Sequence, residues 1–335
     1  MEVAADFYSD FIKFNLNTIA ELKKQGFKFE EYKNWKRRKL RTIKDFLYSK
    51  KTYIQETDLI NDYNYDLVFD FVNWMERIPD PIPRLVHKCR DFTCPEKYQA
   101  GLNLIEKGIK NGYNLLPFLS RQIYDAKEND RMLFTLGITH FHLGKEQDKE
   151  KPLLVKGTKD ILYSFIHKKD CYFIVIDKHG RWDDEELLRI LYKDFPEALK
   201  SWKLEKVTPD NLTDNDKKEI RRKNITTMIT INNETYIPPG WGTSMNGTSV
   251  NARLNLDRFI RYLDSLEKNL ILTLNENKEK IEKDFNIKIE RMNLFLYQTD
   301  PIKILEKESN LIININNFNG DNLSINITNN FSNDI

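Results

Sequence analysis

Hydrophobic spacing predicts that roughly the first 130 residues are helical. Apolar side chains recur at intervals of three and four residues in this part of the chain, which is the pattern of helices with one buried face. The segments that show this spacing are 7–19, 67–75, 98–109 and 115–126. Three prolines at 79, 81 and 83 separate the second segment from the third, because proline cannot continue a helix.

From about residue 131 the pattern changes to the two-residue alternation of strands. We predict strands over 132–143, 160–167 and 171–179, although the beginning of the first also fits a helix, and Lys168–Asp170 joins the last two as a hairpin. A helix with an acidic first turn follows over 182–194, where carboxylates complement the helix dipole. These elements together predict a small antiparallel sheet with helices against it.

The last part of the chain combines a hairpin, a loop, a long helix and a repeat. Asn232-Asn233 lies between two short apolar runs and predicts a tight hairpin, and 254–285 reads as one long or broken helix. Ile313-Asn314-Ile315-Asn316 returns twelve residues later as Ile325-Asn326-Ile327-Thr328, and together these predict a β-hairpin. An isolated hairpin is only marginally stable, so it needs a partner, either the body of this chain or a second copy.

The predicted fold class is α+β, with a helical N-terminal half, a central sheet unit, a C-terminal helix and a β-hairpin tail. The predicted domains are a helical domain, a His-bearing α+β unit, a mixed region and an Asn-rich tail for self-association, over 1–130, 131–204, 205–308 and 309–335.

Composition narrows the class of protein. The chain has 335 residues, 40% of them hydrophobic and 31% charged, with a net charge of +2, which fits a soluble globular protein. Three sparse cysteines favour a reducing cytoplasm, and no run of about 18 apolar residues suggests a membrane helix. We therefore expect a cytoplasmic protein with no membrane partner.

The best candidate for chemistry is a group of histidines. Four of the five histidines lie between positions 140 and 179, and His140 and His142 would share one face of a strand. Histidine exchanges protons near neutral pH, so His140, His142 and His179 could cleave RNA as general acid and base. Lys178 and Arg181 could stabilise charge on the phosphate. The alternative is a half-exposed His-x-His pair without a partner.

The same histidines also permit a metal site. Two imidazoles, a distant third and a carboxylate such as Glu146 suit zinc, iron or manganese. The leading hypothesis needs no metal and no cofactor, and a metal-dependent hydrolase or oxygenase is kept as an alternative.

A basic, aromatic stretch in the N-terminal half is a candidate nucleic-acid contact, because cations bind phosphates and aromatic rings stack on bases. Its residues are Lys33, Trp35, Lys36, Arg37, Arg38 and Arg41. The alternative is an ordinary solvated helix face.

Two resemblances bear on function. The unit from Arg131 to Leu204 resembles an uncharacterised bacterial family, through the His-x-His-Leu-Gly strand at 140–144, the hairpin ending in His179-Gly180 and the acidic helix ending near Pro196. Its hairpin and His-bearing strand are similar to the small sheet of RelE/ParE-type ribonuclease toxins. The Asn-rich repeat resembles β tails of some bacterial effector and defence proteins, which implies self-association.

These resemblances and the histidines predict a toxin-like or anti-phage endoribonuclease that acts without metal. On this hypothesis His142→Ala should abolish toxicity on overexpression and leave melting unchanged. The second hypothesis is a non-enzymatic sensor or regulator that assembles through its tail and binds nucleic acid or a phage protein. It would keep its function in the histidine variants and lose it when 309–335 is deleted.

Overall fold

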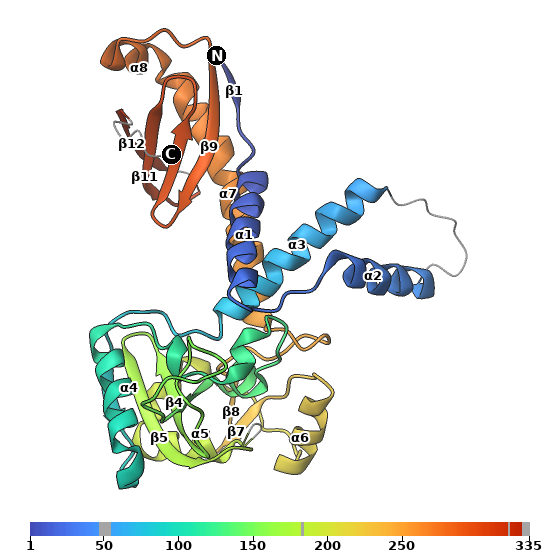
Figure 1. Cartoon of the computed structure of the whole chain (residues 1–335), viewed down its shortest axis with the longest axis vertical. Coiled ribbons are helices and arrows are strands. Elements are labelled where there is room, and N and C mark those ends of the chain that lie inside the picture. Colours follow the sequence, from blue (N-terminus) through green and yellow to red (C-terminus); the bar gives the residue numbers. More distant parts are fainter. Residues whose placement is uncertain (47–54, 182–183, 321, 330–335) are drawn as a thin grey trace. The chain divides into compact units, whose positions relative to one another are not determined.

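The computed structural model describes residues 1–46, 55–181, 184–320 and 322–329 (Figure 1). The predicted α+β class is confirmed, with helices and several sheets in one chain. The chain forms two compact units, each built from separate stretches of sequence. Unit 1 comprises Met1–Leu22, Glu31–Val68 and Asn255–Ile335, and unit 2 comprises Lys23–Glu30 and Phe69–Leu254.

This division differs from the predicted boundaries at residues 130, 204 and 308. Two long helices, α3 (Glu56–Met75) and α7 (Val250–Glu276), each contribute residues to both units. Periodicity within a helix shows which face is buried but not which core that face packs against. The hydrophobic pattern therefore cannot show where a helix passes from one unit to the other.

The helices of unit 1 follow the predicted spacing. Helix α1 (Phe7–Lys24) buries Phe7, Phe11 and Ile19, and the Phe11 ring lies 5.0 Å from that of Phe259 in α7. The remaining helices of this unit are α2 (Tyr32–Phe46) and α8 (Lys278–Phe285). In the described part of the chain, no helix is both long and apolar enough to cross a membrane.

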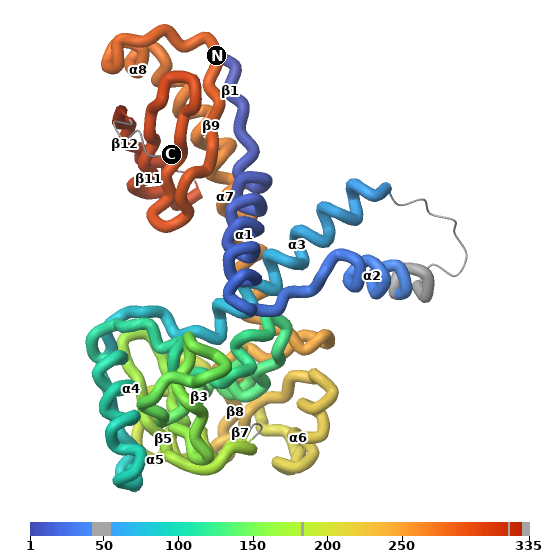
Figure 2. Tube along the Cα trace, viewed as in Figure 1, coloured from blue at the N-terminus to red at the C-terminus, as the bar shows by residue number. Residues whose placement is uncertain are grey.

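The predicted tail hairpin is present and belongs to a larger sheet. Strands β11 (Leu311–Phe318) and β12 (Leu323–Asn329) pair antiparallel, as the chain path in Figure 2 shows. The sheet order is β1-β9-β10-β11-β12, and the other strands are β1 (Glu2–Ala4), β9 (Arg291–Thr299) and β10 (Ile302–Glu306). The chain's own β10 therefore supplies a partner for the hairpin, at β11. Residues 330–335 lie outside the described residues.

Unit 2 contains the histidine-bearing sheet, in the order β2-β5-β4-β3. Its strands are β2 (Leu85–Lys88), β3 (Ile138–His142), β4 (Asp160–His167) and β5 (Asp170–Lys178). The predicted antiparallel pairing of β3, β4 and β5 is present, and β2, a strand that the pattern did not predict, pairs parallel to β5. This strand is four residues long and follows the proline cluster, so it shows no alternation long enough to be recognised.

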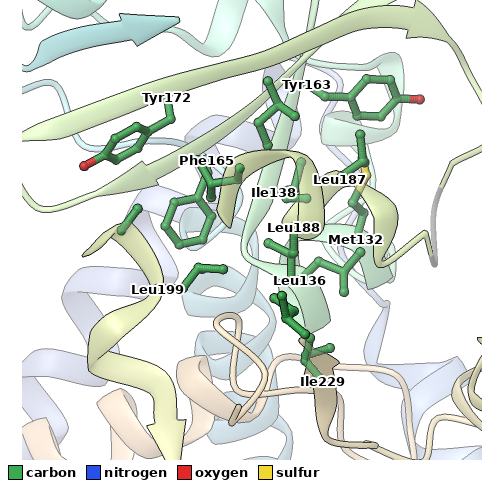
Figure 3. Close-up of a cluster of buried hydrophobic side chains, with 14 of the residues drawn as sticks. Met132, Leu136, Ile138, Tyr163, Phe165, Tyr172, Leu187, Leu188, Leu199 and Ile229 are labelled. Atoms are coloured by element: carbon green, nitrogen blue, oxygen red, sulfur yellow. The ribbon is translucent and has the colours of Figure 1, made fainter. Parts of the chain in front are cut away.

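The hydrophobic core of unit 2 explains why strands form where alternating apolar residues predicted them. Helix α5 (Glu186–Asp194) packs Leu187, Leu188 and Leu191 against a cluster that includes Tyr163 and Phe165 of β4 (Figure 3). Full burial of a leucine or phenylalanine contributes about 1.5–3 kcal/mol. Trp182 and Asp183, where the helix was expected to start, lie outside the described residues.

The remaining elements of unit 2 surround this sheet. Helix α4 (Gln99–Asn111) ends at Gly112, whose φ of 69° suits a helix C-terminus. A second small sheet, β6-β8-β7, precedes the loop at 240–249, and its strands are β6 (Lys203–Leu204), β7 (Ile229–Ile231) and β8 (Glu234–Tyr236). Helix α6 (Asp214–Arg222) starts at a capping box on Thr213.

Two predicted elements differ from the structure. The expected helix over 115–126 is two 3₁₀ turns, Leu116–Phe118 and Arg121–Tyr124, separated by extended backbone at Leu119 and Ser120. The expected strand over 132–143 begins only at Ile138. Before it, Met132–Leu136 forms a π-helical turn that ends at Gly137, whose φ is 68°. A left-handed glycine is the usual way to leave such a turn.

Candidate functional site

Strand β3 places the His-x-His pair inside unit 2. All five residues of the strand are buried, with His140 at 5% and His142 at 8% exposure. The alternative of a half-exposed pair is therefore wrong. Close packing extends past the strand, since a Cβ atom on Gly101 of α4 would lie 2.0 Å from the carbonyl oxygen of Leu143. Only glycine allows the helix to approach the chain this closely.

The structure brings the third imidazole to this pair. His179 is exposed, and its ring centroid lies 5.0 Å from that of His142 and 6.2 Å from that of His140. Strand β4 lies between β3 and β5, but its first residue, Asp160, pairs with Lys178. His179 is thus one position beyond the end of β4, where no strand residue separates it from the β3 histidines.

His142 is held as a neutral donor. Its Nδ1 accepts a hydrogen bond from the backbone N–H of Thr158 at 2.9 Å, so the proton of the neutral ring is assigned to Nε2. Burial, followed by the nearby His179 and His140, lowers the pKa of His142 to about 4. At neutral pH this ring offers an Nε2–H group and carries no positive charge.

His140 reaches a polar pocket that the sequence did not reveal. The pocket has a volume of about 170 Å³ and is lined by Gln122, Glu128, Asn129, Asp130, Arg131 and His140. Burial lowers the pKa of His140, and the negative charge of Asp130 opposes part of this effect. A charged run, 128–131, directly before a buried segment was the available signal, but only the fold shows that it faces a histidine.

The two cations predicted to face a phosphate differ in their surroundings. Lys178 is exposed beside His179. Arg181 donates to Asp184 at 2.7 Å and to Asp177 at 3.3 Å. Because these two carboxylates already neutralise the guanidinium, the structure does not support Arg181 as a phosphate ligand, and Lys178 is the cation that remains from the prediction.

The metal alternative requires several ligand side chains close together. Within residues 1–46, 55–181, 184–320 and 322–329, no three His, Cys, Asp or Glu side chains are grouped as a metal site requires.

The basic stretch lies in unit 1, on α2, and its aromatic residue packs inward. Trp35 is 1% exposed and donates its Nε1–H to Asp66 at 2.8 Å. A ring buried in this way has no face for a base, so the prediction of stacking on Trp35 is contradicted. Lys36 pairs with Glu56 at 2.5 Å. The exposed members of the stretch are Lys33, Arg37, Arg38 and Arg41, and their contact with nucleic acid remains a prediction.

Comparison of the chain with protein-family models, curated proteins and solved structures found no match. The resemblances described above therefore stay predictions, and the site has to be interpreted from its own geometry.

Proposed function

We propose that this protein is an endoribonuclease of toxin or anti-phage type, whose reaction centre is formed by His140, His142 and His179. The observation that carries the proposal is the convergence of three imidazoles with different surroundings, their ring centroids 5.0 and 6.2 Å apart. Cleavage of RNA without a metal needs a base, an acid and a donor to the phosphate, and each of these roles suits one of the three rings.

The proposed reaction moves two protons. His140, neutral because burial lowers its pKa, accepts the proton of a ribose 2′-hydroxyl. The 2′-oxygen forms a bond to phosphorus while the bond from phosphorus to the 5′-oxygen breaks. The imidazolium of His179, the exposed ring of the three, gives its proton to that leaving oxygen. The products are a 2′,3′-cyclic phosphate and a 5′-hydroxyl.

His142 has a different role in this scheme. A ring with a pKa of about 4 is seldom protonated at neutral pH, so it is a poor acid. Its Nε2–H group is instead suited to donate a hydrogen bond to a phosphate oxygen on which charge develops. Lys178, exposed beside His179, supplies a further positive charge.

Profiling of RNA after induction tests the proposal in cells. Expression of the unaltered chain in bacteria should stop growth and produce new RNA ends within minutes, whereas the His179→Ala variant should do neither. His179 is preferred to His142 for this test because it is exposed, while replacing His142 with alanine removes the acceptor for Thr158 and disturbs packing. Identical RNA profiles for the two proteins at equal expression would refute the proposed function.

A further inference from the structure

The pocket at His140 is a preformed polar pocket next to the three imidazoles. A smaller hollow, lined by Arg77, Ser120 and Thr139 among others, shares four residues with the main pocket. The shared residues are Gln122, Glu128, Asp130 and His140. One ligand bound there would therefore contact the proposed base, His140.

A buried arginine lines the smaller hollow beside this pocket. Arg77 is 5% exposed, and its Nη1 and Nη2 donate to the backbone carbonyls of Gln122 and Asp125 at 3.3 and 2.5 Å. These bonds fix the segment that carries Glu128 and Asp130. The Nε atom of Arg77 is buried and has no hydrogen-bond partner among the residues that the structure describes. A buried donor left in this state costs free energy, and such a cost is common where a ligand completes a site.

Two carboxylates supply the acceptors of the pocket. Burial raises the pKa of Glu128, although the charge of Arg77 opposes the shift. Asp130 uses Oδ1 to accept the backbone N–H of Leu133 at 3.1 Å, which fixes the orientation of its side chain. Acceptors held in place in this way recognise a ligand that presents N–H groups.

Charge and size limit what the pocket can hold. Arg131 lines the pocket together with Glu128 and Asp130, and Arg77 lines the smaller hollow that shares these two carboxylates. A phosphate would face two carboxylates there, which disfavours an anion. The volume of about 170 Å³ is below the roughly 300–1,000 Å³ typical of larger ligands. These limits favour a neutral, planar group about the size of one nucleobase.

Guanine matches the arrangement of donors and acceptors best. Its N1–H and N2–H₂ groups form a donor edge that a carboxylate accepts, and its O6 and N7 atoms accept from arginine or an amide. In their nucleosides, adenine and cytosine have no ring N–H and so no such donor edge, and uracil has a single ring N–H. The pocket offers carboxylates at Glu128 and Asp130 and donors at Arg131 and Gln122.

We propose that this pocket binds the guanine base of the RNA substrate, so that cleavage occurs next to guanosine. The inference rests on the proposed ribonuclease function for its biological meaning, but base binding can be measured without cleavage. Asn129, whose Nδ2 donates to Asn224 at 3.0 Å, is held at the pocket by a hydrogen bond from its own side chain.

Calorimetric titration of the full-length protein with the four nucleoside 3′-monophosphates tests the inference. A carboxylate contact to a base edge discriminates by about 1–3 kcal/mol, which corresponds to roughly a 5- to 150-fold preference for the guanine nucleotide. Glu128→Gln replaces one acceptor with a donor. This variant should prefer the guanine nucleotide by roughly 5-fold or less. Glu96 is an exposed carboxylate outside the pocket. The control variant Glu96→Gln should leave the preference for the guanine nucleotide unchanged.

The outcomes separate this inference from the proposed function. Equal binding of the four nucleotides, or full competition by inorganic phosphate alone, would overturn the guanine assignment even if the protein cleaves RNA. A guanine preference that Glu128→Gln reduces would support it even if no RNA is cleaved. Should that variant fail to fold, the ranking of the four nucleotides on the unaltered protein decides the question.

Discussion

Replacing His179 with alanine should slow RNA cleavage by the purified protein by roughly 10²- to 10⁴-fold, the usual contribution of a general acid. His179 is exposed and lies past the end of β5, so its loss removes a proton donor without opening a cavity. The melting temperature should therefore stay close to that of the unaltered protein. The measurement is the single-turnover cleavage rate of a defined RNA at saturating protein.

A second histidine provides the matched control. His87 is only partly exposed and contacts Asp170 at 2.8 Å, and it is not one of the three clustered rings. His87→Gln should cleave at nearly the normal rate. An unchanged rate in the His179 variant would remove the proposed acid, and an equal loss in both variants would show that the effect is not specific to the cluster.

Acidification should destabilise the protein through His142. Burial lowers the pKa of this ring to about 4 in the folded protein, whereas an unfolded chain has a histidine pKa of about 6.5. As the pH falls below about 6.5, the unfolded chain binds the proton first, so stability is lost between about pH 6.5 and 4 and is fully present above that window. The shift corresponds to about 3 kcal/mol. His140, whose pKa is also lowered, adds a loss in the same direction.

Urea unfolding at pH 7 and pH 4.5 measures this effect. His142→Asn retains a side-chain oxygen that can accept the Thr158 N–H but has no proton to titrate in this range. The variant should be less stable at pH 7 and should lose clearly less stability on acidification than the unaltered protein. If both proteins lose the same free energy between the two pH values, His142 is not held neutral by burial.

Local patterns predicted the parts of the fold that depend on neighbouring residues. The hairpin of β4 and β5, the tail hairpin and the turn at Asn232-Asn233 were predicted from alternation and turn chemistry. Both of those asparagines have positive φ, at 50° and 61°, as a two-residue hairpin turn of type I′ requires. Such features need no knowledge of distant contacts.

The features that the sequence could not predict depend on contacts between residues far apart in the chain. The alternation in β3 is the same whether its second face meets solvent or more protein, so the burial of His140 and His142 was not visible. Glu128 and Asp130 were overlooked because a short charged run is usually a solvated loop, and only the fold places it against a histidine. The sequence also could not show that the Trp35 ring is buried, because its hydrogen-bond partner, Asp66, comes from another helix.

The chemical structure of the cleaved RNA ends tests the reaction centre most directly. Purified protein incubated with a defined RNA should leave 2′,3′-cyclic phosphate and 5′-hydroxyl ends, because transfer of the 2′-hydroxyl proton to His140 makes the 2′-oxygen the nucleophile. The same ends should be almost absent with His179→Ala. Fragments that carry a 3′-hydroxyl and a 5′-phosphate, or an RNA that stays intact with the unaltered protein, would contradict a histidine acid–base mechanism.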